Sequence, residues 1–254
     1  MTRDDALREL GLWPRWVRRA GDEPAPASLR PGEGTAAPTP GRGPTAASSA
    51  PLSPDERAAH IATLDWSNFT ADVDGCTACG LCRTRKRSVP GVGDRKAEWL
   101  FVGEAPGADE DVQGEPFVGQ AGRLLDNMLA ALGLARSRNV YIANVLKCRP
   151  PNNRTPLPDE VAACRHYLDR QIALIQPRLI VALGKSAANT LLGREATIAS
   201  LRGRVHDYAG VPLVVTYHPA YLLRTLHDKA KAWEDLVLAR RTLREAAAAS
   251  GTGS

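Results

Sequence analysis

Four short apolar runs stand out along the chain and predict buried strands. Each run lacks the polar alternation of a half-exposed strand, which is typical of parallel strands covered on both faces. The runs occupy residues 98–102 (EWLFV), 140–143 (VYIA), 179–183 (LIVAL) and 213–217 (LVVTY).

Helical patterns separate these runs and complete the prediction of an α/β fold. Residues 120–132 place five apolar side chains on one face and stop at Gly133. Residues 157–175 repeat apolar positions at helical spacing, with Pro158 in the first turn, and residues 229–247 form a charged closing helix. Strands that alternate with helices indicate a mostly parallel sheet.

The composition divides the chain into four parts. Residues 1–20 form a short amphipathic segment, and 27 of the 34 residues in 21–54 are Pro, Gly, Ala, Ser or Thr. Such a segment buries too little apolar surface to offset its chain entropy, so we expect a disordered linker. The folded domain is expected at residues 55–247, followed by a disordered tail at 248–254.

Charge and hydropathy exclude some classes of protein. No run approaches the ~20 apolar residues that a membrane-spanning helix needs. The first ten residues, MTRDDALREL, contain acids and no apolar stretch, so we expect no secretory signal and a cytoplasmic location. The net charge of +5 permits a nucleic-acid partner without establishing one.

Polar, Gly- and Pro-rich segments follow all four predicted strands. They are GEAPGADED at 103–111, NVLKCRPPNNR at 144–154, GKS at 184–186 and HPAYLLR at 218–224. Because open α/β sheets bind ligands at the carboxyl ends of their strands, we expect one site where these segments meet.

Five cysteines in a chain of this kind point to metal ligation more than to disulfides. Cys76, Cys79 and Cys82 form a C-x2-C-x2-C run, and Cys148 and Cys164 lie far along the chain. A ferredoxin-like run would place a fourth Cys and a Pro close behind, so the distant cysteines are expected to close the centre. The spacing alone suits zinc or an iron–sulfur cluster equally.

The remaining motifs offer acids and one histidine at strand ends. GEAPG lacks the Lys-Ser/Thr pair of a nucleotide-binding loop, and GKS lacks the upstream Gly of that motif, so neither predicts nucleotide binding. Gly184 is instead expected to allow close packing at a helix start. Of the five histidines, His218 alone follows a predicted strand. A carboxylate at a strand end is suited to orient a water molecule.

Taken together, GEAPGADED, PFVGQAG, NVLKCRPPNNR, HPAYLL and the CTAC loop resemble the family 4 uracil-DNA glycosylases, a prokaryotic branch of the uracil-DNA glycosylase superfamily. The resemblance covers residues 75–224 in collinear order. It implies a three-layer α/β/α sandwich around a central four-stranded parallel sheet. It also implies a 4Fe-4S cluster, with Cys82 spare and the ligands Cys76, Cys79, Cys148 and Cys164.

The same resemblance implies a catalytic set. Gly103, Glu104 and Ala105 resemble the turn that binds water and base, and Glu110 matches a second acid of that motif. His218 matches the residue that contacts uracil O2, where a donor stabilises the leaving base. Glu104 and Glu110 both remain candidates for holding the attacking water.

Recognition of base and DNA is implied at other positions. Phe117 matches the aromatic residue that stacks on uracil, and Asn144 the amide that reads its edge. Tyr221, Leu222 and Arg224 resemble the loop that enters the DNA helix once the base is flipped out, and Leu222 or Leu223 is expected to fill the vacated space. Cations suited to phosphates are Arg83, Arg85, Lys86, Arg87, Lys147, Arg149 and Arg154.

The resemblance therefore predicts hydrolysis of uracil from single- or double-stranded DNA by a monomer with no membrane partner. Two alternatives stay open from the sequence. One is a glycosylase with a broader range of deaminated bases, and the other is a non-catalytic iron–sulfur DNA-binding module.

Overall fold

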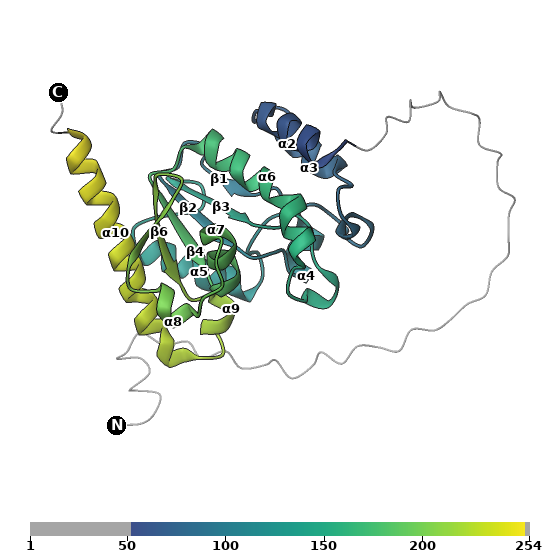
Figure 1. Ribbon diagram of the computed structural model, residues 1–254. Helices are drawn as coiled ribbons and strands as arrows, with labels where there is room; N and C mark the ends of the chain where they lie inside the picture. The colour runs from purple at the N-terminus through teal and green to yellow at the C-terminus, as the bar shows by residue number, and fades with distance from the viewer. Residues whose placement is uncertain (1–51, 252–254) are drawn as a thin grey trace, which may run out of the picture. The chain divides into compact units, whose positions relative to one another are not determined.

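The computed structural model describes residues 52–251 (Figure 1). The expected N-terminal segment and residues 21–51 of the expected linker lie outside this range, as do residues 252–254 of the tail. The first described helix is α2 (Pro54–Thr63), which Ser53 caps. The last helix, α10 (Lys229–Gly251), continues past the predicted end at residue 247. The run of four alanines at 246–249 explains the difference, since alanine has the highest helix propensity.

A six-stranded sheet forms the centre of the described residues, with strand order β1-β3-β2-β4-β6-β5. The four inner strands are parallel, which confirms the expected central sheet, and β1 and β5 add antiparallel edges. The strands are β1 (Val92–Gly93), β2 (Trp99–Gly103), β3 (Val140–Asn144), β4 (Leu179–Leu183), β5 (Val205–Tyr208) and β6 (Val211–Thr216).

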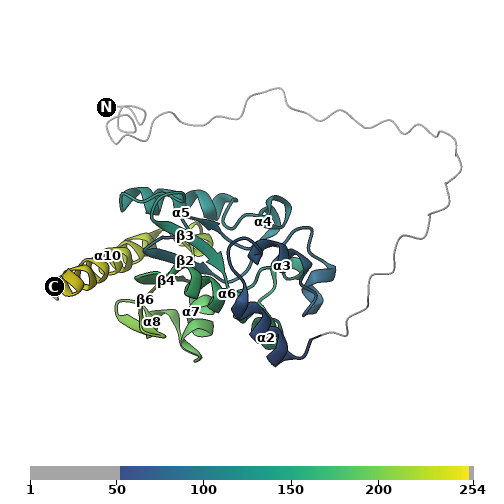
Figure 2. The ribbon, with the colours of Figure 1, turned by 90° about the horizontal axis from the view of Figure 1, so that it is seen from above.

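Alternate side chains of the inner strands enter two different cores. Leu100 and Val102 of β2 pack with α6 (Pro158–Ile175), α7 (Lys185–Leu192) and α8 (Ile198–Leu201). Trp99 and Phe101 of the same strand pack with α5 (Gln120–Ala131) and α10 on the other face. Figure 2 shows the sheet between these two groups of helices, so the three-layer arrangement is confirmed.

Two N-terminal helices form a separate small core against α6. Phe69 and Val73 of α3 (Phe69–Gly75) are buried with Ile61 of α2 and Tyr167 of α6. Cys76 follows directly after α3, and the short 3-10 helix η1 (Gly80–Arg83) comes next. This packing holds the cysteine-bearing loop beside α6.

The remaining short elements lie at the carboxyl ends of the strands. The first three follow the strands β2, β3 and β6, and the last leads into α10. They are α4 (Ala108–Gln113), η2 (Pro151–Asn153), α9 (Pro219–Leu222) and η3 (Leu226–Asp228). None of the helices in the described part of the chain combines the length and the hydropathy that crossing a membrane requires.

Candidate active site and cysteine cavity

A pocket opens where the carboxyl ends of β2, β3 and β6 meet. Most of the side chains that the sequence assigned to a base-binding site line it. These are Glu104, Ala105, Glu110, Phe117, Asn144, His218 and Arg224. Three of the four strand-end segments therefore meet at this pocket as expected, whereas GKS at 184–186 lines a neighbouring pocket.

Asn144 and Gly103 form the floor of this pocket. They end neighbouring strands and lie opposite each other in the β2–β3 register. The Asn144 side chain is 2% exposed, and its Oδ1 atom has no hydrogen-bond partner in the described residues. A Cβ atom on Gly103 would lie 2.3 Å from that oxygen and 2.6 Å from the Phe117 ring. Only glycine at this position therefore lets the Asn144 amide and the Phe117 ring pack against the end of β2.

Phe117 forms one wall, and its backbone is strained to do so. Its φ is 56°, a left-handed conformation that is rare for bulky residues. Arg136 donates hydrogen bonds to the carbonyl oxygens of Pro116 and Phe117. A Cβ atom on Gly122 would lie 1.6 Å from the Phe117 carbonyl oxygen, so the first turn of α5 presses directly on this loop.

Replacing Gly122 with alanine is expected to move the Phe117 loop, because the new methyl group and the Phe117 carbonyl cannot share one position. If Phe117 stacks on the bound base, the loss is that of one stacking contact, ~1–3 kcal/mol, or roughly 5- to 150-fold in base binding. Base binding by the variant is measured against Gly75→Ala, where a Cβ atom meets nothing within 4 Å. Equal binding by both variants would show that Phe117 does not touch the base.

Glu110 serves the architecture of the pocket. Its carboxylate accepts hydrogen bonds from the backbone N–H groups of Gly107 at 3.0 Å, Val118 at 3.0 Å and Gly119 at 3.3 Å. These bonds cap α4 and join the turn after β2 to the Phe117 loop. With its oxygens engaged in this way, Glu110 is less suited than Glu104 to hold a water molecule.

Glu104 is the less constrained acid of the two. Burial raises the pKa of its carboxyl group above the usual value, and a hydrogen bond with Ser186 partly opposes that shift. Its backbone carbonyl accepts from the N–H of Leu146 at 3.0 Å, which fixes the turn against the strand-end segment after β3. The side chain is thus held at the pocket wall.

His218 faces Phe117 across the pocket, with 5.5 Å between ring centroids and 30° between planes. The backbone N–H of Ala220 donates to Nδ1 at 3.1 Å, which assigns the ring proton to Nε2. Burial lowers the pKa of His218 to about 4, with a smaller opposing effect from Glu110. The ring is therefore neutral near pH 7. Gly184 caps α7 with a φ of 94°, and a Cβ atom there would lie 3.0 Å from the His218 Cβ, so the expected close packing at this helix start is confirmed.

The loop after His218 departs from the expectation at one position. Leu222 is 1% exposed and packs with Tyr217 and Ala232, so it belongs to a core and does not fit the role of a DNA contact. The neighbouring Leu223 is 39% exposed. Tyr221 is half-buried, stacks on Tyr217 and donates its hydroxyl hydrogen to Asp228.

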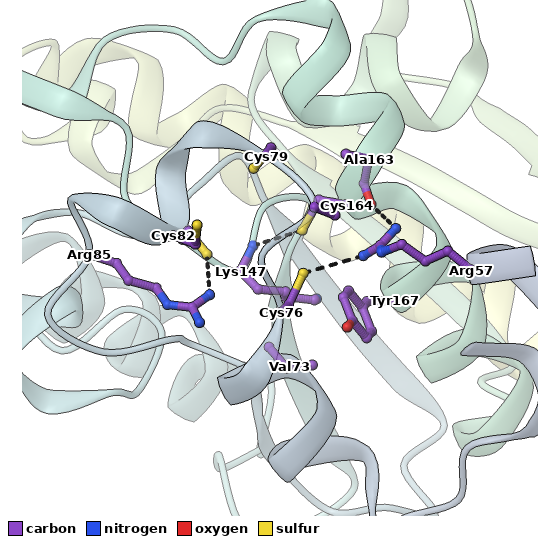
Figure 3. Close-up of a pocket in the computed structure, with 12 residues that line it drawn as sticks. Arg57, Val73, Cys76, Cys79, Cys82, Arg85, Lys147, Ala163, Cys164 and Tyr167 are labelled. Carbon is purple, nitrogen blue, oxygen red and sulfur yellow. Dashed lines mark hydrogen bonds between the residues drawn. The ribbon is translucent and has the colours of Figure 1, made fainter. Parts of the chain in front are cut away.

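All five cysteines line a second cavity, on the α6 side of the sheet. Figure 3 shows Cys76, Cys79, Cys82 and Cys164 around one space, and Cys148 completes the lining. In residues 52–251, no three His, Cys, Asp or Glu side chains meet closely enough to hold a single metal ion. The sulfur atoms are instead spread around the wall, and Cys82 is not set apart from the other four.

Several donors point at these sulfur atoms. Arg85 donates to Cys148 Sγ at 2.9 Å and Arg57 to Cys76 Sγ at 3.5 Å. Hydrogen bonds and cations of this kind stabilise thiolates that bind a metal centre. The donor set therefore fits a thiolate-bound centre. Arg57 lies in α2, far from any cysteine motif in the sequence, and no sequence signal singled it out.

Three of the cations expected to contact phosphate are hydrogen-bonded to other groups of the protein. Lys147 is 1% exposed, and Arg85 is turned toward Cys148. Arg154 forms two hydrogen bonds with the carboxylate of Glu160, at 2.9 Å and 2.5 Å. The exposed cations that remain from that set are Arg83, Lys86 and Arg87, with Arg149 half-buried.

Known proteins are similar to this chain across the same region. The family model of the Uracil DNA glycosylase superfamily matches residues 90–237. A type-4 uracil-DNA glycosylase of Archaeoglobus fulgidus is 49% identical over 164 residues, covering 61% of this chain and 82% of that protein. A type-4 uracil-DNA glycosylase of Pyrobaculum aerophilum is 45% identical over 183 residues, with coverages of 69% and 93%. A type-5 uracil-DNA glycosylase of the same organism is 36% identical over 152 residues, with coverages of 54% and 67%.

The matched region contains every residue that lines the pocket, from Glu104 to Arg224. The two type-4 proteins are more similar to this chain than the type-5 protein is, in both identity and coverage. This chain therefore belongs to the uracil-DNA glycosylase superfamily and, within it, to the type-4 uracil-DNA glycosylases.

Proposed function

We propose that this enzyme flips uracil out of DNA and hydrolyses its bond to the sugar, leaving an abasic site. The observation that carries the proposal is the buried Oδ1 of Asn144, which has no hydrogen-bond partner in the described residues and belongs to a side chain that lines the pocket with Phe117. A buried acceptor without a partner costs about 1–3 kcal/mol. A ligand with an N–H group at that point offsets this cost, and uracil presents N3–H.

Selectivity between bases follows from the amide of Asn144. Its carbonyl oxygen accepts from uracil N3–H and its amino group donates to uracil O4. Cytosine presents an acceptor and a donor in the reverse order, so both groups of Asn144 would face like groups. Phe117 supplies the stacking face, which is independent of the pairing edge.

Hydrolysis breaks the C1′–N1 bond, and its electron pair leaves with uracil while water adds to C1′. His218 donates from Nε2–H to uracil O2 and stabilises the negative charge that develops there. Glu104 holds the attacking water and favours the positive charge on the sugar. Glu110 holds the Phe117 loop and the turn after β2 together, since its carboxylate accepts hydrogen bonds from both.

DNA lies across the mouth of the pocket in this proposal. The target atom is unreachable inside a duplex, so the nucleotide must leave the stack. Arg224 at the pocket rim and the exposed cations Arg83, Lys86 and Arg87 are suited to phosphates. Of the leucines in the loop, the exposed Leu223 is the side chain available to fill the vacated space.

The function is tested with oligonucleotides that carry a single uracil, in single- and double-stranded form. Free uracil and an alkali-labile abasic site are expected products. Matched oligonucleotides with cytosine or thymine at the same position are expected to stay intact. Release of cytosine at a rate similar to that of uracil would refute the role given to Asn144.

The pH dependence of excision is expected to report Glu104. Because burial raises its pKa, the carboxylate is lost as pH falls through a value above that of an ordinary glutamate. The acid limb of kcat/KM should therefore begin above pH 4.5, the usual glutamate value, and vanish in Glu104→Gln. His218, with a pKa of about 4, stays neutral through most of that range. A limb that persists unchanged in Glu104→Gln would assign it to another group.

We further propose that the cysteine cavity holds a 4Fe-4S cluster through Cys76, Cys79, Cys148 and Cys164. Thiolates spread around a cavity suit a centre of several atoms, whereas one zinc ion needs four ligands at ~2.0–2.3 Å from a single point. When bound, the cluster supplies structural cross-linking between loops. The residues around it position the segment after β3, which follows directly on Asn144.

Cysteine substitutions distinguish ligands from the spare thiol. Cys148→Ser is expected to lose iron and sulfide and to lower the unfolding temperature, because Cys148 is buried and ties two distant segments together. Cys82→Ser, the matched control, is expected to keep both. Metal and sulfide analysis of anaerobically purified protein provides the readout. Zinc in place of iron, or iron loss from Cys82→Ser, would contradict the assignment.

Two further expectations belong to the same proposal. Activity as a monomer stays a prediction, and a sedimentation measurement of active protein tests it. The cytoplasmic location stays a prediction, and fractionation of the native cells tests it.

A further inference from the structure

Lys147 lies between the base pocket and the cysteine cavity and contacts both. Its ammonium group donates to the backbone carbonyl oxygen of Asn144 at 2.7 Å and to Oε1 of Gln171 at 2.5 Å. Its own backbone N–H donates to Cys164 Sγ at 3.2 Å, a contact drawn in Figure 3. One residue therefore joins the amide at the pocket floor to a sulfur atom of the other site.

The second acceptor of the ammonium group is itself immobilised. Gln171 is fully buried, and its amino group donates to the Pro90 carbonyl oxygen at 2.7 Å and to the Tyr141 hydroxyl at 3.2 Å. Gly91 packs against both side chains, since a Cβ atom there would lie 2.8 Å from the Tyr141 ring and 3.0 Å from the Gln171 nitrogen. The acceptor that Gln171 offers to the lysine ammonium group is therefore fixed in position.

A buried ammonium group is a costly way to fill space. Removing a charge from water carries a large penalty, and an apolar side chain of similar length would pack without it. The two acceptors at the head group are neutral oxygens, so two hydrogen bonds, one of them to Asn144, fix the position of the ammonium group.

We propose that Lys147 is a positioning residue that sets the Asn144 amide for uracil and couples that setting to the occupied cysteine site. The inference rests on the proposed function and deepens it. Asn144 is the last residue of β3, and the backbone after it still pairs with the end of β2, through the N–H of Val145 to the Gly103 carbonyl. The Asn144 carbonyl carbon is bonded directly to the Cα atom that carries the side chain. Lys147 donates a hydrogen bond to the oxygen of that carbonyl.

Lys147→Met tests the proposal, because methionine keeps an unbranched stem and removes the ammonium group. Inhibition by free uracil is expected to weaken roughly tenfold or more, in line with loss of a hydrogen bond from a charged donor. Affinity for DNA with a ready-made abasic site should not change, because that ligand lacks the base. Lys96→Met, at an exposed lysine of a loop, is the matched control. Unchanged uracil inhibition in Lys147→Met with normal iron content would overturn the proposal.

The coupling has its own readout, since linkage between two sites is reciprocal. Free uracil is expected to slow the loss of iron to a chelator in the wild type and in Lys96→Met, and to have no effect in Lys147→Met. A merely structural lysine would change the rate of iron loss without changing its response to uracil. An equal response to uracil in all three proteins would therefore also overturn the proposal.

A further variant and a non-catalytic measurement cover the remaining outcomes. If Lys147→Met fails to fold, Gln171→Met keeps the lysine and removes one acceptor, and a smaller weakening in the same direction is expected. Unchanged uracil inhibition in Gln171→Met would then leave Lys147 a structural residue. The NMR signals of the Asn144 side-chain amide, identified by their absence in Asn144→Ala, should shift in the lysine or glutamine variant. This measurement remains decisive if the wild type releases no uracil, an outcome that would refute the proposed function separately.

Discussion

His218→Ala is expected to release uracil roughly 10²–10³ times more slowly than the wild type, the usual loss when one donor to a developing oxyanion is removed. The hydrogen bond from Ala220 to Nδ1 leaves Nε2–H as the free donor of the ring. The low pKa keeps that donor neutral, so it requires no counter-charge before the bond breaks. The effect should therefore fall on the chemical step and leave uracil-DNA binding almost unchanged.

Single-turnover excision separates the two steps, because enzyme in excess over substrate reports the chemical step without product release. His218→Gln retains an N–H donor on a longer, more flexible stem and should lose less than His218→Ala. His206→Ala, on the edge strand β5, is the control for loss of a histidine elsewhere. Release by His218→Ala at the wild-type rate would remove this residue from the reaction.

The inner strands were predictable because their environment is uniform. Strands β2, β3 and β4 are buried at every position, and such strands read as continuous apolar runs. The edge strand β5 alternates between exposed and half-buried residues and contains His and Asp, so it carries no such signal. Strand β1 has two residues and no pattern of its own. The sequence therefore predicted the core of the sheet and not its edges.

The sequence predicted which segments of the chain line the pocket, but not the direction of every side chain in them. Parallel strands bring their carboxyl ends to one edge, so Asn144 and His218 had to lie on the same side of the sheet. The direction of a side chain is not set by that rule. Leu222 turns into the core, Arg85 turns toward Cys148, and the Lys147 ammonium group turns toward Gln171, because three-dimensional packing supplies partners that are distant in the sequence.

Glu110 had a local signal that was available from the sequence. A glutamate three residues after the residue that precedes a helix is typical of a capping box, and Gly107 and Glu110 have that spacing. The additional bonds to Val118 and Gly119 had no such signal, since they depend on the strained turn at Phe117. Strain of this kind is commonly found where a protein has shaped a site for a ligand.

Asn144→Ala is expected to slow excision by roughly 10²–10⁴-fold, since two hydrogen bonds to the uracil edge are lost at ~1–3 kcal/mol each. Stability should respond differently. The variant also deletes a buried oxygen that has no partner in the described structure, which offsets the packing that it loses. Its free energy of unfolding is expected to equal or exceed that of the wild type.

Asn189→Ala provides the opposite case within the same chain. Asn189 is also buried, but its amide is satisfied by Glu195 at 2.9 Å and by the N–H of Ala196 at 3.2 Å. Removing the Asn189 amide should lower the free energy of unfolding by about 1–3 kcal/mol and leave the recognition of uracil unchanged. Chemical denaturation and single-turnover excision of both variants compare the two effects. A stable Asn189→Ala protein beside an unfolded Asn144→Ala protein would mean that Asn144 is held for the fold, and that its free oxygen is not kept for the base.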